Sequence, residues 1–157
     1  MRSFRAAACI AAAGLVLALG ACGNDDPAEG LLSNIDKARS ARSLSSLQTG
    51  LVTLGLVQAE APAASAQSVA AALQAKDPTN RYTTAAPTDV GIVQVAGGGG
   101  GPVMLVSVSS APSDSRAQAY IGAWQGNGTT MYYAGPQPPG FASSVPSGPG
   151  WSATPPQ

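Results

Sequence analysis

The chain has 157 residues, which is enough for one domain with additional segments. It carries eight basic and eight acidic residues, and charged residues make up only 10% of the sequence. This balance gives no basic face for nucleic acid, and the absence of histidine excludes Ser-His-Asp catalysis and histidine metal ligands. We therefore expect a small, alanine-rich domain without a cofactor, a metal site or a nucleic-acid partner.

The segment 1–21 has the three zones of a secretory signal peptide. Arg2 and Arg5 give a positive start, an uncharged apolar run follows from residue 6 to 19, and small residues precede Cys22. This apolar run is shorter than the stretch of about 20 residues that a membrane-spanning helix needs. We therefore expect residues 1–21 to be a cleaved signal peptide and not a permanent membrane helix.

The segment Leu19-Gly20-Ala21-Cys22 resembles the lipobox of bacterial lipoproteins. In that family the cysteine thiol receives a diacylglyceryl group, and a dedicated peptidase cuts immediately before the cysteine. The resemblance implies lipidation at Cys22, with residues 22–29 as a lipidated N-terminus and linker. Two acyl chains anchor a protein firmly, so we expect a lipid anchor at the extracytoplasmic face of a bacterial cell membrane. An ordinary signal peptide with a chance cysteine is the alternative, and the choice between inner and outer membrane stays open.

The residues that follow have the spacing of one long helix. Asp26 is a suitable cap, Pro27 suits the first helical turn, and Pro62 ends the helix. Gly50 and Gly55 each cost about 1 kcal/mol relative to alanine, so they mark places where the helix can bend or split. The predicted apolar face consists of Leu31, Leu32, Ile35, Ala38, Ala41, Leu44, Leu47, Leu51, Leu54 and Val57.

A second, shorter helix is predicted from Ser65 to Lys76. Ser65 is a suitable cap, apolar residues recur at helical spacing, and Asp77 followed by a proline stops the helix. For both helices, packing within the domain is favoured over binding to a partner.

Extended segments predominate after residue 80. Strand-forming residues favour strands over residues 81–84, 89–95 and 103–109. Between the last two, five consecutive glycines from residue 97 predict a flexible hairpin connection. A phosphate cradle would need a helix after the glycines and usually a lysine, whereas here a strand follows.

Asn-Gly at residues 127–128 is a strong signal for a two-residue hairpin turn. It predicts that residues 115–124 and 129–134 pair as antiparallel strands, with Trp124 opposite Met131. A short helix in the first of these segments is the alternative.

Four aromatic residues gather in this hairpin. Aromatic side chains on a sheet can bind sugars or peptides, so these four are candidate ligand contacts. They also supply the large side chains that an alanine-rich core lacks, and packing is the interpretation that we favour. The four residues are Tyr120, Trp124, Tyr132 and Tyr133.

Residues 135–157 contain seven prolines, four glycines and no charged residue. No periodic apolar pattern survives in this segment. The composition predicts a disordered tail.

The order of these elements is similar to the soluble part of type IV pilins and pseudopilins. The resemblance is carried by residues 38–61, followed by Asn80-Arg81-Tyr82, and it covers residues 30–134. A pilin keeps the apolar N-terminal helix that forms the filament core, whereas this chain would lose its apolar segment on processing. The resemblance implies a structural or interaction role outside the cytoplasm, without filament assembly through such a helix.

Taken together, the sequence predicts an α+β domain over residues 30–134, in which the long N-terminal helix and the short helix pack on one face of an antiparallel sheet of about four strands. We expect a structural or interaction role at the cell envelope, with the membrane and an envelope protein as partners and no enzymatic activity. A small-ligand or sugar-binding role through the hairpin aromatics is the alternative. A carboxylate-dependent hydrolase is a third hypothesis. Such an enzyme needs a pair of carboxyl groups, and the fold could bring together two of the eight carboxylates that are scattered along the sequence.

Overall fold

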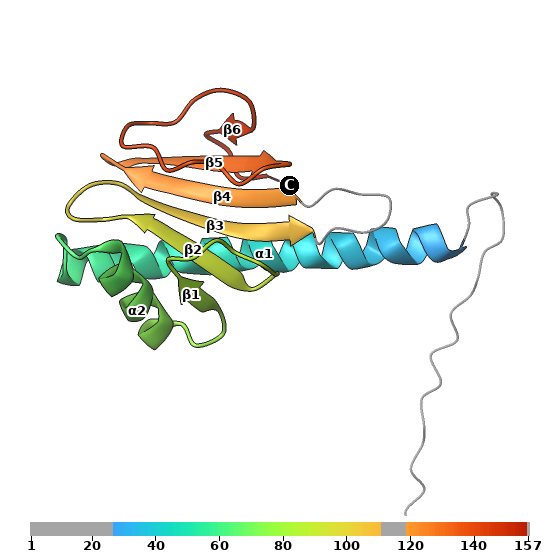
Figure 1. The fold of residues 1–157 in the computed structure, drawn as a ribbon, viewed down its shortest axis with the longest axis horizontal. Coiled ribbons are helices and arrows are strands. Elements are labelled where there is room, and N and C mark those ends of the chain that lie inside the picture. Colours follow the sequence, from blue (N-terminus) through green and yellow to red (C-terminus); the bar gives the residue numbers. More distant parts are fainter. Residues whose placement is uncertain (1–26, 111–118, 157) are drawn as a thin grey trace, which may run out of the picture.

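The computed structural model describes residues 27–110 and 119–156. The predicted signal peptide and Cys22 lie outside the described residues, as does the predicted cap Asp26. In the described part, two helices cover one face of a six-stranded sheet (Figure 1). The α+β class is confirmed, and the sheet has more strands than the four that the sequence predicted.

The long helix α1 spans Pro27–Glu60 and is not interrupted at either glycine. Gly50 is buried against the sheet, where an added Cβ would lie 3.0 Å from Leu105 Cδ1 and 3.2 Å from the Tyr82 hydroxyl. The absent side chain therefore lets α1 approach the sheet closely. Gly55 is exposed, and a Cβ there would meet nothing within 4 Å.

The buried face of α1 differs from the predicted one at its N-terminal side. Ile35 and Ala38 are exposed, because the first turns of α1 extend beyond the ends of the strands (Figure 1). Ala41 is exposed because it lies on the side of α1 away from the sheet. The side chains of Leu31 and Leu32 lie outside the described residues.

Polar residues of the buried face take part in the contact with the sheet instead. Ser43 Oγ donates a hydrogen bond to the carbonyl of Val108 at 2.5 Å. The fully buried members of this face are Ser43, Ser46, Leu47, Gly50, Leu54 and Val57.

The second helix, α2, spans Ala66–Lys76 as the sequence predicted. Ser65 caps it, because its side-chain oxygen accepts a hydrogen bond from the backbone N–H of Ser68. Val69, Ala70 and Leu73 are buried against the sheet and α1. The two helices are joined by only a few residues, so they lie side by side on one sheet face.

The strands follow one another across the sheet in chain order. The first pair is parallel and the other four pairs are antiparallel, so the sheet is mixed and not purely antiparallel as predicted. A short connection suffices for the parallel pair, because a three-residue strand requires a return of only about 10 Å. The strands are β1 Arg81–Thr83, β2 Ile92–Gly97, β3 Val103–Ser110, β4 Ala119–Gly126, β5 Thr129–Gly135 and β6 Trp151–Ser152.

The two predicted hairpins are present. β2 and β3 pair across the glycine run, and β4 and β5 pair across Asn127 and Gly128, which both have positive φ. Trp124 lies opposite Met131, as the predicted turn requires. The alternative of a helix is excluded from Ala119 onward, because β4 starts there.

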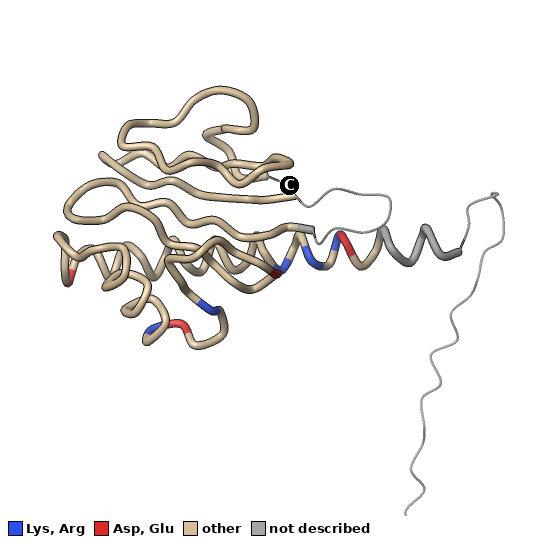
Figure 2. Tube along the Cα trace, viewed as in Figure 1, with Lys and Arg blue, Asp and Glu red and all other residues tan. Residues whose placement is uncertain are grey.

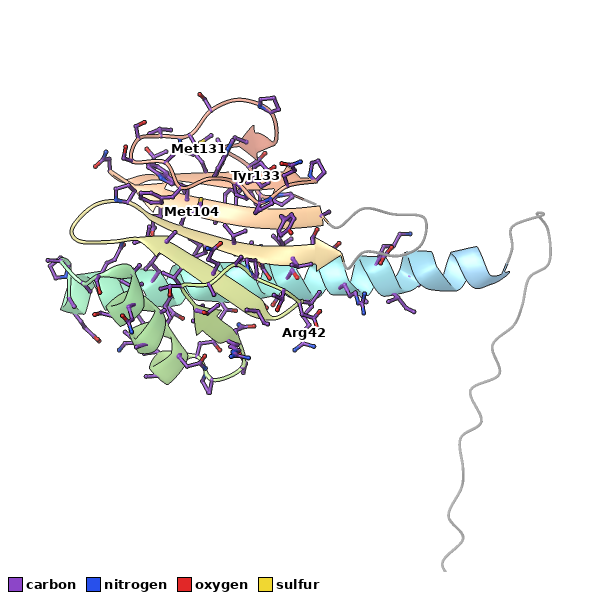
Figure 3. All side chains as sticks on the ribbon, in the orientation of Figure 1. Arg42, Met104, Met131 and Tyr133 are labelled. Carbon is purple, nitrogen blue, oxygen red and sulfur yellow. The ribbon has the colours of Figure 1, made fainter. Side chains whose placement is uncertain are left out.

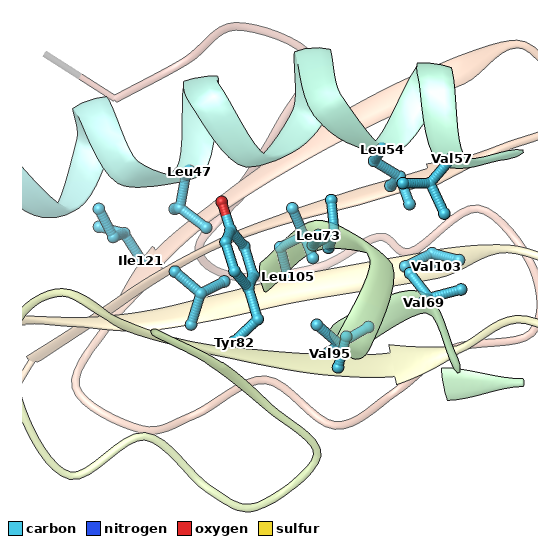
Figure 4. Packing of buried hydrophobic residues seen from close by; sticks show 12 residues of the cluster. Leu47, Leu54, Val57, Val69, Leu73, Tyr82, Val95, Val103, Leu105 and Ile121 are labelled. Atoms are coloured by element: carbon cyan, nitrogen blue, oxygen red, sulfur yellow. The ribbon is translucent and has the colours of Figure 1, made fainter. Parts of the chain in front are cut away.

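Apolar side chains fill both faces of the sheet. The larger cluster lies between the helices and the sheet (Figure 4) and includes Leu47, Leu73 and Leu105. A smaller cluster lies on the opposite face and is formed by Met104, Val106, Trp124, Ala96, Tyr120, Met131 and Trp151. All of the residues from 103 to 109 in β3 are consequently buried.

The prediction of a disordered tail is wrong for residues 135–156. This segment crosses the second sheet face and then pairs with β5 through β6. A Cβ added at Gly97 would lie 2.5 Å from the Phe141 ring, and one at Gly122 would lie 3.5 Å from Pro139. Proline loses little conformational entropy on folding, and an irregular segment can therefore cover an apolar face without any periodic pattern.

Candidate functional site

The four aromatic residues predicted as ligand contacts come from β4 and β5, and two of them are buried. Trp124 has 0% of its surface exposed and Tyr133 has 9%, while Tyr120 and Tyr132 are half-buried. Figure 3 shows Met104, Met131 and Tyr133 within this part of the molecule. The structure thus assigns Trp124 and Tyr133 mainly to packing.

The polar atoms of both buried aromatics bind the C-terminal segment. Trp124 Nε1 donates to the carbonyl of Ala142 at 2.8 Å, and the Tyr133 hydroxyl donates to the carbonyl of Gln137 at 2.8 Å. The rings of Tyr133 and Trp151 have centroids 5.3 Å apart and are tilted by 56°. These contacts occupy the groups that would otherwise recognise a ligand.

Two surface hollows adjoin this region. The one beside Tyr132 and Thr154 has a volume of about 140 Å³, which is below the roughly 300 Å³ at which small-molecule pockets begin. Another, of about 360 Å³, lies between the glycine run and the turn at residues 127–128. Gln125 lines it, but its Oε1 is buried and has no hydrogen-bond partner in the described part of the chain.

A buried polar cluster lies where α2, β1 and α1 meet. The Tyr82 hydroxyl donates to Asp77 Oδ2 at 2.7 Å, and Asn80 Nδ2 donates to the same oxygen at 2.8 Å. Asp77 Oδ1 accepts from the backbone N–H and the hydroxyl of Thr79. Ser46 Oγ of α1 donates to Asn80 Oδ1 at 2.6 Å. This cluster therefore links three elements.

Hydrogen bonding determines the charge state of the cluster. Burial raises the pKa of Asp77, but the hydrogen bonds from Thr79, Tyr82 and Asn80 outweigh it and bring the pKa from 3.8 to about 2. Burial, together with the Asp77 carboxylate, raises the pKa of Tyr82 above its ordinary value. At neutral pH the pair is a carboxylate and a protonated phenol.

These protonation states give the cluster a structural character. Both oxygens of Asp77 accept two hydrogen bonds each, and the residue is only 5% exposed. A general base needs a free acceptor oxygen within reach of the substrate and a pKa near the working pH. Asp77 provides neither, because both of its oxygens already accept hydrogen bonds and its pKa is low. Sequence reasoning used Asp77 as a helix stop and as one of eight scattered carboxylates. The signal it missed is the threonine two residues later, because aspartate commonly accepts from that backbone N–H in a turn.

The acidic side chains of the described domain form no metal site. Within residues 27–110 and 119–156, no three His, Cys, Asp or Glu side chains come together to hold a metal. Glu60 forms an ion pair with Lys76 at 2.8 Å. None of the helices in this described part is long and apolar enough to cross a membrane.

The most unusual surface lies on α1, on the side away from the sheet. Val52 is 74% exposed and Leu56 is 58% exposed. No charged residue occurs between positions 43 and 59, and Figure 2 shows α1 without charge over this length. A solvent-facing helix side normally carries charged residues. This surface, which we call the outer face, consists of Ala41, Ser45, Gln48, Val52, Leu56 and Ala59, all of them exposed.

The outer face was not predicted, because the predicted pattern described only the buried side of the helix. The signal was present as a long run without charge. A comparison with known proteins adds no candidate function, because no protein-family model, no curated protein and no solved structure matches the chain.

Proposed function

We propose that this chain is an exported bacterial lipoprotein, anchored through Cys22 at the extracytoplasmic face of the cell membrane. The support is the sequence Leu19-Gly20-Ala21-Cys22, which closes a short apolar segment behind a positively charged start. The described domain would then stand at the membrane surface, with α1 as the element nearest to the anchor.

The role of the domain in this proposal is to bind another macromolecule, without catalysis. The observation that carries this is the uncharged outer face of α1, where Val52 and Leu56 expose 74% and 58% of their surfaces. Exposed apolar surface of this kind is typical of protein interaction sites. A helix laid over one face of a sheet, as in pilin globular domains, leaves such a helix side open to a partner.

The other two hypotheses have less support. A sugar-binding role needs accessible aromatic rings, and Trp124 and Tyr133 are buried. A hydrolase needs two carboxyl groups open to substrate. Asp77 is buried and fully hydrogen-bonded, and Glu60 is paired with Lys76.

The anchor is tested by replacing Cys22 with serine and separating membrane and soluble fractions. We expect the native chain in the membrane fraction and Cys22→Ser in the soluble extracytoplasmic fraction, because the two acyl chains are lost. Cys9→Ser is the matched control, since Cys9 lies in the segment to be discarded and its replacement should leave the chain membrane-bound. Membrane retention of Cys22→Ser equal to that of the native chain, in a form that has lost residues 1–21, would overturn the anchor.

A further inference from the structure

We infer that the outer face of α1 binds the same face of a second copy of this chain, with the two helices antiparallel. The inference deepens the proposed interaction role by naming the partner, and it rests on that role. Two independent observations lead to it. One is the apolar centre of the face, and the other is the position of the charges at its two ends.

The apolar centre lies directly opposite the buried side of α1. Val52 follows the buried Ser43 by nine positions, and nine steps of about 100° place it on the reverse side of the helix. Its 74% exposure agrees with this position. Leu56 is one turn further along, and the flanking Ser45 and Ala59 are small enough for a second helix to approach closely. Burying Val52 and Leu56 against a partner would remove apolar surface from water.

The charges at the ends of this uncharged run are opposite in sign. Arg42 precedes it and Glu60 follows it, and the two are about 27 Å apart along the helix axis. Their separation corresponds to about five full helical turns, so they lie on the same side of the outer face. Both side chains are exposed, and the Arg42 guanidinium lies beside Gly91, so its long side chain would have to turn from there toward the partner.

Only an antiparallel pair brings these opposite charges of the two copies together. A two-fold axis near Val52 brings Arg42 of each copy next to Glu60 of the other, and each pair attracts. A parallel two-fold pair would place the two copies of Arg42 on opposite sides of the contact, and the two copies of Glu60 likewise, so neither charge would meet an opposite one. Glu60 already binds Lys76 through one oxygen, and a carboxylate can accept from a second donor.

The proposed contact is small. Stable protein interfaces bury about 1,600 Å² in total, and one helix face of about 27 Å supplies less than this. We therefore expect a weak dimer in dilute solution that becomes populated when both copies are held on one membrane, where the effective concentration is raised. A two-fold axis perpendicular to the membrane would place both N-termini at the same height.

Thiol crosslinking in membranes distinguishes the two arrangements. Two differently tagged full-length chains, Ser45→Cys and Ala59→Cys, are expressed together and treated with a short bismaleimide. In the antiparallel dimer, position 45 of one copy lies opposite position 59 of the other. We expect the yield of 45–59 crosslinks between the two differently tagged chains to be at least about fivefold above the yield of 45–45 or 59–59 crosslinks between identically tagged chains. Preferential 45–45 and 59–59 crosslinking would overturn the antiparallel arrangement.

The control position is also exposed. Asn127→Cys lies in the turn between β4 and β5, and its crosslinking gives the background from random collision. Crosslinking of Ser45→Cys with Ala59→Cys at this background would overturn the dimer. The native chain carries no introduced cysteine, so a crosslink there identifies a free Cys9 or Cys22. Neither thiol should remain after processing and lipidation, and such a crosslink therefore reports failure of the anchor separately. Repeating the pair in the Cys22→Ser background at high protein concentration tests the dimer without the membrane.

Charge reversal provides a second test. Arg42→Glu places like charges together at both ends of the dimer and should lower 45–59 crosslinking by about fivefold. Arg42→Glu combined with Glu60→Arg restores opposite charges and should restore crosslinking. An effect of Arg42→Glu that the double variant does not reverse would contradict the predicted pairing. Circular dichroism of each variant checks that the fold is retained.

Discussion

Asp77 ends α2 and accepts hydrogen bonds from the turn that follows and from β1. Its backbone N–H donates to the carbonyl of Leu73, which closes the last turn of the helix. Its carboxylate accepts hydrogen bonds from Tyr82 and Asn80. The side-chain oxygen of Asn80 in turn accepts a hydrogen bond from Ser46 of α1. One ionised side chain therefore fixes the relative position of three elements.

This arrangement predicts a loss of stability in acid. The carboxyl of Asp77 has a pKa of about 2 in the folded chain and an ordinary value of 3.8, so the unfolded chain binds this proton more readily between those values. The ionised Asp77 therefore contributes roughly 2 kcal/mol to the free energy of unfolding. This contribution is complete above about pH 4 and is lost as the pH falls through 2. Urea unfolding followed between pH 5 and pH 2 measures it.

Two variants separate Asp77 from the other acidic groups. Asp77→Asn should show a smaller decrease of the free energy of unfolding in acid than the native chain, even if it is less stable at neutral pH. Asp89→Asn replaces an exposed carboxylate and should retain the native dependence. Equal pH profiles for the two variants would show that Asp77 does not carry the effect.

The roles of single residues were predictable where they depend on near neighbours in the chain. Ser65 capped α2 and Asn127 formed the hairpin turn as expected, since both depend on near neighbours in the chain. The Asp77 cluster depends on Ser46, which lies in a different element, α1, and it was not predictable from local chemistry.

At the scale of elements, the glycine run between β2 and β3 is more than a flexible connection. Gly99 donates its backbone N–H to the carbonyl of Ala64 at 2.8 Å, which ties the loop to the segment between α1 and α2. Gly98 has φ +101°, and an added Cβ would lie 2.6 Å from the same carbonyl oxygen. The hairpin end and the helix connection are therefore in direct contact.

We expect Gly98→Ala to lower the free energy of unfolding by about 3 kcal/mol, because it adds a steric clash to an unfavourable backbone conformation. Gly99→Ala is the matched control, since Gly99 also has positive φ but a Cβ there meets nothing within 4 Å. It should cost about 1 kcal/mol. Urea unfolding of both variants measures the difference, and equal losses would argue against the close contact at Gly98.

The existence of the helices and hairpins was predictable, because each has its own periodicity and end signals. The buried face of α1 was predictable only in part. Periodicity identified Leu47, Leu54 and Val57, but it could not show that the sheet ends before Ile35 and Ala38. That limit depends on strand lengths, which the sequence of the helix does not contain.

The described part of the molecule has three layers: the helices, the sheet and the C-terminal segment (Figure 1). The third layer was missed because low periodicity was interpreted as disorder. The sequence did contain a signal in β3, where Val103 to Val106 form a continuous apolar run. A strand with only one covered face normally alternates, so a continuous run indicates cover on both faces.

Removal of residues 136–157 tests the third layer. It should expose Met104, Val106 and Trp124, which are at most 2% exposed in the folded chain. Each such side chain contributes about 1.5–3 kcal/mol when buried, so we expect a loss of several kcal/mol and binding of a hydrophobic dye. Trp124 is then the sole remaining tryptophan, and its fluorescence should shift to longer wavelength.

Removal of residues 153–157 alone is the control for this truncation. It leaves β6, the Tyr133–Trp151 contact and the bond from Trp124 to Ala142 in place. We expect native stability and no dye binding. A long truncation that behaved like this control would show that residues 136–152 do not protect the second sheet face.

The sheet begins and ends with very short strands, β1 with three residues and β6 with two. Long, flat edge strands offer unpaired backbone groups on which further chains can add, and short ones offer little. Copies that are crowded together therefore have few backbone groups through which to extend the sheet from one molecule to the next. At these two edges we therefore expect little tendency to form β-aggregates when copies are crowded together, which leaves association to side chains.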